Sequence, residues 1–178
     1  HGSVSWRGAA PERASGRCST PSHLPVVASP TMQRARWNRS APLFRGDDAT
    51  ALTRPIPDSK MSIVEHVLYL GGRGRETPYT STSESADVAA YFAGKLGCVW
   101  ETAVKAAEDQ GAIHLARQQL LLCLKGFGKG KAKWNDAFEV AQAARYVEEW
   151  SEHLLDWSNL PASNVTEAVG RSFRKSRR

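Results

Sequence analysis

Residues 79–92, with the sequence YTSTSESADVAAYF, join a predicted strand directly to a predicted helix, and this junction decides the fold class. The aromatic, β-branched and hydroxyl-bearing residues at 79–83 favour a strand. Either Ser83 or Ser85 is suited to cap a helix, which is then expected over 86–93. The inward face of that helix is expected to carry Ala86, Ala89, Ala90 and Phe92.

Strand and helix patterns continue on both sides of this junction. Upstream, they predict a short strand at 43–46, an amphipathic helix within 60–70 and a glycine-rich turn at 71–75. Downstream, they predict a helix over 99–109, a buried strand at 119–124, a basic loop at 126–133, a helix over 135–146 and a final strand starting near residue 165. Residues 147–157 are ambiguous between helix and strand. This mixture indicates an α+β fold.

The positive charge of the chain, a net of +6 over 178 residues, is concentrated at its ends. Residues 1–40 hold six arginines and one glutamate, and residues 171–178 hold five basic residues and no acid. The segment 41–170 holds 13 basic and 17 acidic residues, a net of −4. We therefore expect a basic Pro/Ser/Arg-rich arm, a globular domain and a basic tail. A nucleic-acid-binding domain carries its basic surface on the folded core, so nucleic acid is not expected as a partner.

Missing patterns exclude several classes of protein. No apolar run approaches the roughly 20 residues of a membrane helix, and the first thirty residues hold no signal-peptide core. The three cysteines include no C-x-x-C pair, which excludes a paired disulfide framework and a four-cysteine zinc site. The loop at 126–133, GFGKGKAK, lacks the spacing of a Walker phosphate loop. Neither a membrane nor a bound metal is expected.

Three groups of polar residues suit the chemistry of a nucleotide with a cleavable glycosidic bond. These are Arg45; Ser81, Thr82 and Ser83; and Glu148, Glu149 and Glu152. An arginine offers a donor fork for phosphate or ribose oxygens. Hydroxyl groups at a strand end can orient the other side chains, and a carboxylate can stabilise positive charge at the anomeric carbon.

Each group also has an ordinary structural interpretation. Arg45 can form a surface ion pair with Asp47 or Asp48, worth under about 1 kcal/mol. The serine-rich segment can be an edge strand followed by a helix cap. The three glutamates can lie on the solvated face of a helix that continues from residue 135. His66 can line the site or be a structural residue of its helix.

In order along the chain, these motifs resemble the R-S-E class of mono-ADP-ribosyltransferases, the cholera-toxin-like branch. The resemblance covers about residues 42–170 and rests on LFRGD at 43–47, YTSTS at 79–83, AAYF at 89–92 and a glutamate before LPASNV at 160–165. It implies two packed β-sheets with flanking helices and a cleft for NAD, which is the substrate. A bacterial toxin or secreted effector is the type of protein that this resemblance favours.

The resemblance also implies roles for individual residues. Arg45 would grip the phosphate and ribose of NAD, Ser81 would support the active site, and Glu152 would stabilise the ribosyl cation, with Glu149 as the alternative. The remaining residues expected to contact NAD are Gly46, His66, Thr82, Ser83 and Phe92. Residues 72–75 would lie in the loop that leads to the serine strand.

The family's Glu-x-Glu or Gln-x-Glu pair is absent, because Trp150 stands two residues before Glu152. Two functions are therefore expected as alternatives. The first is a monomeric transferase that modifies a host macromolecule, a protein, after delivery by a dedicated secretion system. The second is a catalytically degenerate effector of the same fold that binds a host protein or peptide without turnover. A third, a nucleic-acid-binding domain that uses the basic ends, conflicts with the acidic core.

Overall fold

A single antiparallel sheet organises the part of the chain that the computed structural model describes, residues 37–72, 74–124 and 134–177. Within these residues the strands follow the order β4-β5-β2-β1-β3-β6. Their bounds are β1 Leu43–Asp47, β2 Tyr79–Ser83, β3 Cys98–Thr102, β4 Ile113–Leu115, β5 Glu152–Asp156 and β6 Arg174–Lys175. The mixture of helices and strands expected from the sequence is confirmed, and the predicted strands at 43–46 and 79–83 are β1 and β2.

The middle of the sheet is a seam between β1 and β2. These strands share one register pair, Phe44 with Ser83, whereas β1–β3 and β2–β5 are each paired over five residues. The two halves, β4-β5-β2 and β1-β3-β6, therefore meet at a narrow junction. Where two packed sheets were expected, the described strands form one sheet with two halves.

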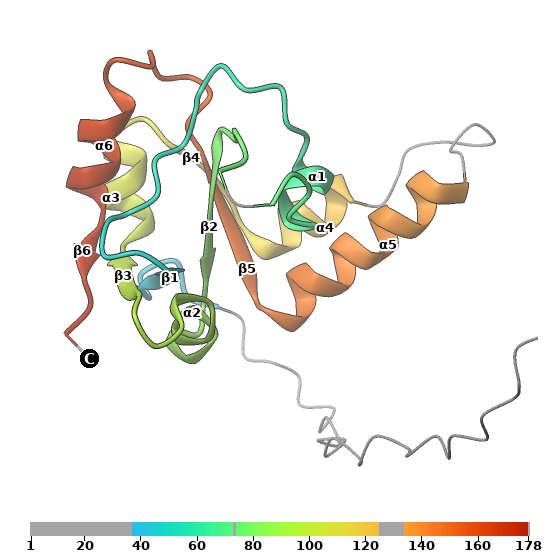
Figure 1. Cartoon of the computed structure of the whole chain (residues 1–178), viewed down its shortest axis with the longest axis horizontal. Coiled ribbons are helices and arrows are strands. Elements are labelled where there is room, and N and C mark those ends of the chain that lie inside the picture. Colours follow the sequence, from blue (N-terminus) through green and yellow to red (C-terminus); the bar gives the residue numbers. More distant parts are fainter. Residues whose placement is uncertain (1–36, 73, 125–133, 178) are drawn as a thin grey trace, which may run out of the picture. The chain divides into compact units, whose positions relative to one another are not determined.

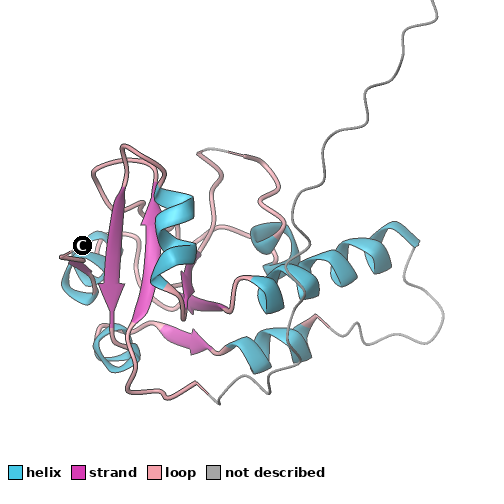
Figure 2. Ribbon diagram, turned by 90° about the horizontal axis from the view of Figure 1, so that it is seen from below, coloured by secondary structure: helices cyan, strands magenta, loops and turns pink. Residues whose placement is uncertain are grey.

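Helices cover both faces of the sheet (Figures 1 and 2). Their bounds are α1 Ile63–Val67, α2 Ala86–Ala93, α3 Val104–Asp109, α4 Arg117–Cys123, α5 Trp134–Glu149 and α6 Val165–Ser172. One core cluster packs α1, α4 and α5 against Leu154 of β5. The other packs α3 and α6 against Leu155 and Trp157. Every residue of β5 up to Leu155 is buried, which is why its sequence shows no alternating pattern.

Hydroxyl groups set two of the helix starts. Ser85 caps α2, and its Oγ accepts a hydrogen bond from the amide of Val88, which confirms the predicted helix over 86–93. Ser62 and Glu65 form a capping box at the start of α1. That helix covers only five of the residues in the predicted range 60–70.

Three predicted elements are wrong. The expected helix over 99–109 is strand β3 followed by the short helix α3, and the expected strand at 119–124 is the helix α4. An apolar run of this length suits a buried strand or a helix equally. The expected final strand near residue 165 is the helix α6, whose buried residues have the helical spacing 165, 168, 169 and 172.

Two smaller predictions also need correction. On α2, Ala86 and Ala89 are buried as expected, but Ala90 is exposed and Phe92 is 44% exposed, while Ala93 is buried instead. The domain also extends beyond residue 170, since α6 ends at Ser172, Phe173 is buried and β6 pairs with β3. The basic loop at 126–133 and residues 1–36 of the arm lie outside the described residues.

Gly46 allows β1 and α2 to pack together without a side chain between them. A Cβ atom at this position would lie 1.9 Å from the carbonyl oxygen of Ala89 and 2.7 Å from the amide nitrogen of Ala93. Because both are backbone atoms, Gly46→Ala is expected to lower the free energy of unfolding by at least about 2 kcal/mol. Urea denaturation measures this loss.

Gly170 of α6 supplies the matched control, because a Cβ atom there would meet no atom within 4 Å. Gly170→Ala is expected to raise the free energy of unfolding by about 0.5–1 kcal/mol, the usual gain of alanine over glycine in a helix. Equal stability of the two variants would contradict the close packing of β1 on α2.

Candidate active site

A pocket of about 580 Å³ lies at the seam, walled by β1, β2, α2, the start of β5 and the segment between α1 and β2. The predicted site residues that line it are Arg45, Gly46, His66, Ser81, Thr82, Ser83, Phe92 and Glu152. Side chains alternate along a strand, and Ser83 is paired with Glu152 across β2 and β5. Ser81, Ser83 and Glu152 therefore share one face of the sheet.

Arg45 connects the two halves of the sheet beside the seam. Its Nε and Nη2 atoms donate to the two carboxylate oxygens of Asp47 at 3.0 and 2.8 Å, and its Nη1 donates to the carbonyl oxygen of Ser81 at 3.1 Å. Thr53 donates a further hydrogen bond to Asp47 at 2.7 Å. The Arg45 side chain is 15% exposed and that of Asp47 4% exposed. Asp47 is buried and Arg45 is partly buried, so the surface ion pair considered from the sequence is wrong.

His66 holds the Ser81 hydroxyl in place through a hydrogen bond. Its Nε2 atom lies 2.8 Å from the Ser81 Oγ, and its Nδ1 atom lies 2.7 Å from the Thr77 Oγ1, which also accepts from the amide of Tyr79. Burial, reinforced by the charges of Arg75 and Arg45, lowers the pKa of His66 to about 3. The imidazole is therefore neutral at neutral pH. If the Thr77 hydroxyl donates to Nδ1, then Nε2–H donates to Ser81, and the Ser81 hydroxyl donates in turn to the Glu152 carboxylate.

Glu152 is the buried acid of the pocket, only 5% exposed. Burial raises its pKa to about 7, and this effect is opposed by the Ser81 hydrogen bond and by the charges of Arg75 and Arg45. Its Oε2 atom is buried and has no hydrogen-bond partner among the described residues. Near neutral pH the side chain is divided between the acid and the carboxylate.

The other two glutamates lie outside this pocket. Glu149 is at the exposed end of α5, where it pairs with Arg145 at 3.7 Å, and Glu148 is also exposed. The solvated helix face considered from the sequence therefore holds for these two residues but is wrong for Glu152, which begins β5. Of the three acids, the structure brings only Glu152 to Arg45 and Ser81.

The remaining hydroxyl groups of β2 hold its neighbours in place. The Ser83 Oγ donates to the carbonyl oxygen of Trp150 at 2.7 Å and thereby fixes the turn before Glu152. The Thr82 Oγ1 donates to the carbonyl oxygen of His153 at 3.1 Å. Both hydroxyl groups have structural partners, although their residues line the pocket.

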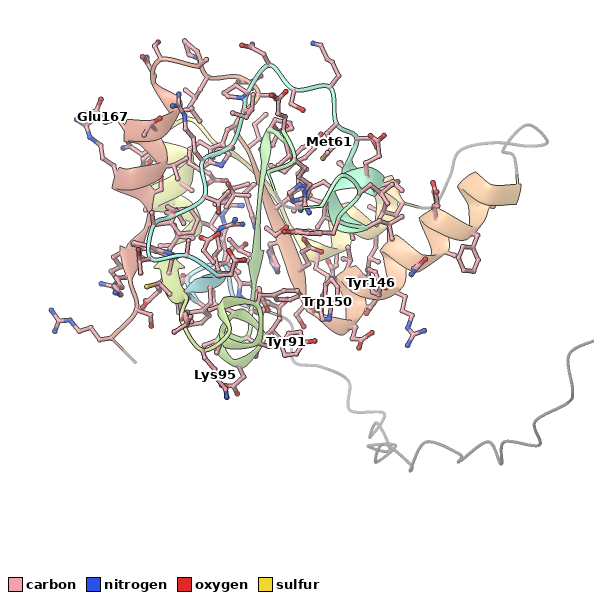
Figure 3. All side chains as sticks on the ribbon, viewed as in Figure 1. Met61, Tyr91, Lys95, Tyr146, Trp150 and Glu167 are labelled. Atoms are coloured by element: carbon pink, nitrogen blue, oxygen red, sulfur yellow. The ribbon has the colours of Figure 1, made fainter. Side chains whose placement is uncertain are left out.

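A row of aromatic side chains leads from the pocket to the surface. Phe92 and Trp150 line the pocket with ring centroids 5.0 Å apart. Tyr146 stacks on Trp150 at 4.5 Å, and Tyr91 meets Phe92 at 5.4 Å. Figure 3 shows Tyr146 and Trp150 side by side at the end of α5, with Tyr91 of α2 nearby. Of these four aromatic residues, only Phe92 is expected from the sequence to contact a ligand.

A second polar network, which the sequence did not reveal, lies on the face of β5 opposite to Glu152 and the pocket. The Nε2 atom of His114 lies 2.9 Å from the Nδ1 of His153, whose Nε2 lies 3.1 Å from a carboxylate oxygen of Glu84. Trp37 packs edge-on against His153 at 4.5 Å. Burial lowers the pKa of both histidines, that of His114 to about 4, so both are neutral at neutral pH.

No protein-family model, curated protein or solved structure matches this chain. Among residues 37–72, 74–124 and 134–177, no three His, Cys, Asp or Glu side chains are placed to hold one metal ion. No helix in the described part of the chain has the length and apolar character needed to cross a bilayer.

The raised pKa of Glu152 predicts a pH-dependent stability. The native state binds a proton that the unfolded state has lost between pH 4.5 and about 7, so Glu152 destabilises the fold progressively as the pH rises through this window. At pH 8, Glu152→Gln is expected to raise the free energy of unfolding by up to about 3 kcal/mol. At pH 4, where the acid is protonated in both states, the gain is expected to vanish.

Denaturation in urea at both pH values measures this difference. Glu149→Gln is the matched control, because it removes the same charge from an exposed position on α5. An equal gain for the two variants at pH 8 would contradict the burial of the Glu152 carboxylate.

Proposed function

We propose that this protein is an NAD-dependent mono-ADP-ribosyltransferase that releases nicotinamide from NAD and modifies a host macromolecule, a protein. The observation that carries the proposal is the convergence of Arg45, Ser81 and Glu152 on one pocket at the seam. The three residues come from β1, β2 and β5, which lie far apart in the sequence. The pocket volume lies within the range of small-molecule sites, roughly 300–1,000 Å³.

In this proposal, Glu152 supplies the main electrostatic contribution to catalysis. When the bond between nicotinamide and ribose breaks, its electron pair leaves with nicotinamide and positive charge develops on the anomeric carbon. An ionised Glu152 at the bottom of the pocket would stabilise that charge, and burial makes the interaction stronger than it would be in water. The nucleophile of the acceptor would then bond to this carbon and release its proton.

Ser81 and His66 would position the carboxylate. The neutral imidazole fixes the Ser81 hydroxyl, and the Ser81 proton directs one oxygen of Glu152. Arg45 keeps β1 and β2 together at the point where these groups meet. The site is therefore organised before a ligand enters, which is what electrostatic catalysis requires.

A second candidate function is a member of the same fold that binds a host protein without turnover. The observation that favours it is Trp150, which lines the pocket where the family's arginine-modifying members carry the first acid of Glu-x-Glu. With one acid instead of two, and that acid only partly ionised at neutral pH, the pocket has less negative charge to stabilise a cation.

Nicotinamide release from NAD, measured with and without a cell extract, tests the proposal. Glu152→Gln is expected to lower the rate by about 100-fold or more, because the variant keeps the shape of the side chain and removes its charge. Glu149→Gln is expected to leave the rate unchanged. Absence of nicotinamide release by the folded wild-type protein under both conditions would favour the non-catalytic binder instead.

The pH dependence of the same rate is a separate prediction. Because the reaction needs the ionised form of Glu152, nicotinamide release is expected to rise with pH and to level off above pH 7. The pKa of His66 is about 3, so this histidine does not contribute to the rise. A rate that is flat between pH 5.5 and 8.5 would contradict the assigned role of Glu152.

A further inference from the structure

The segment between α1 and β2 contributes Tyr69, Gly72, Gly74 and Arg75 to the wall of the pocket. Tyr69 has a φ of 58°, and Gly71, Gly72 and Gly74 have φ values of 86°, 65° and 76°. A positive φ is uncommon for tyrosine and costs conformational energy, which a functional constraint often explains. In this turned segment the Arg75 guanidinium lies over the Tyr69 ring, 3.7 Å from its centroid. Both side chains belong to residues that line the pocket.

Arg75 is a partly buried cation whose guanidinium is poorly satisfied. Its Nε and Nη1 atoms are buried and have no hydrogen-bond partner among the described residues. Burial lowers the pKa of Arg75, which shows that its charged form is costly in this position. The Tyr69 ring offsets part of that cost through a cation–π contact. A buried donor group that lacks an acceptor is expensive, so the site is best suited to receive one from a ligand.

Arg45, the other partly buried arginine of the pocket, already has hydrogen-bond partners. Arg45 donates from all three of its nitrogen atoms to Asp47 and Ser81, and the Asp47 carboxylate neutralises its charge. The Glu152 carboxylate influences Arg75 only as a more distant charge, because it forms no ion pair with Arg75 in the described part of the chain. Arg54 also lines the pocket, but it is exposed and donates to the carbonyl oxygen of Ala162. Among the described arginines of the pocket, Arg75 is therefore the one whose buried nitrogens lack a hydrogen-bond partner.

We propose that Arg75, held on the Tyr69 ring, is the binding residue for a phosphate-type oxyanion and receives the diphosphate of a nucleotide ligand. Guanidinium groups recognise phosphate oxygens through several charge-assisted hydrogen bonds at once. The aromatic rings of Phe92 and Trp150 line the same pocket and offer faces for a planar ring. The nucleotide identity of the ligand rests on the proposed function, whereas the oxyanion site at Arg75 does not depend on turnover.

Calorimetric titration of the whole chain with ADP-ribose, inorganic diphosphate and adenosine tests this assignment. Arg75→Gln is expected to weaken the binding of ADP-ribose and diphosphate by at least about tenfold and to leave adenosine unaffected. Arg75→Lys, which keeps the charge, is expected to lose less affinity than Arg75→Gln. Arg145→Gln is the matched control, because it removes an exposed arginine of α5 that does not line the pocket.

The outcomes separate this inference from the proposed function. Equal affinity of wild type and Arg75→Gln for ADP-ribose, or adenosine binding as tight as that of ADP-ribose, would overturn the oxyanion site. Binding of ADP-ribose that depends on Arg75 without any nicotinamide release would support the oxyanion site and contradict the transferase. Nicotinamide release that is unchanged by Arg75→Gln would support the transferase and overturn the oxyanion site.

The pH dependence of stability distinguishes an effect of the Arg75 charge from a merely structural role of its side chain. The Arg75 charge lowers the pKa of Glu152, so Arg75→Gln is expected to move the pH-dependent stability of Glu152 to higher pH, whereas Arg75→Lys is not. Saturating diphosphate is expected to produce the same upward shift in the wild-type protein, since a bound anion cancels the Arg75 charge. An unchanged pH profile in both experiments would contradict the binding of an anion beside Glu152.

Discussion

The contact of Arg45 with Asp47 and with the Ser81 carbonyl oxygen holds the site at the seam of the sheet. Burying two opposite charges costs desolvation energy, and this cost is recovered only where the geometry and the additional hydrogen bonds are good. Here three arginine nitrogens and the Thr53 hydroxyl satisfy the pair. Because β1 and β2 otherwise share one register pair, this side chain helps to fix the distance between the two halves. The positions of Ser81, Ser83 and Glu152 relative to β1 depend on it.

The pocket separates its charged groups into different roles. Arg45 is neutralised by Asp47, His66 is kept neutral by burial and by two neighbouring cations, and Glu152 titrates near neutral pH. The guanidinium of Arg75 has two buried nitrogens without a hydrogen-bond partner in the described part of the chain. In the described part of the pocket, an unsatisfied guanidinium and a titratable acid therefore lie close to an arginine and a histidine whose charges are cancelled or suppressed. Such separation of neighbouring titratable groups is typical of sites that handle charged ligands.

Much of this arrangement could be predicted from local sequence. The strand at 79–83 and the helix after Ser85 follow from β-branched residues and a hydroxyl cap, and Arg45, Ser81 and Glu152 were identified as one group by resemblance. Other features depend on contacts between distant residues. The apolar run at 119–124 is helical because Leu120 and Leu124 pack together with α1, α5 and β5, a partnership that no local pattern specifies. For α6, by contrast, the helical spacing of the buried residues is already present in the sequence.

The site residues that the sequence did not indicate have one property in common, which is that they reach their positions through backbone geometry and strand register. Arg75 reaches the pocket only because four positive φ angles turn the segment after α1, and His114 meets His153 only because β4 and β5 pair in a particular register. Neither the sign of a backbone angle at Tyr69 nor the register of a strand pair can be derived from residue types alone. The aromatic row likewise joins α2 to the end of α5, which lie about sixty residues apart in the sequence.

The turn at Ser151, where φ is 48°, limits the insertions and deletions that this protein can accept between α5 and β5. Glu152 and His153 are neighbours in β5 that face opposite sides of the sheet, one toward the pocket and one toward the network of His114 and Glu84. Inserting or deleting one residue in this turn would shift the strand by one position and exchange the two side chains. The length of the connection between α5 and β5 is therefore constrained by the need to keep Glu152 on the pocket side of the sheet.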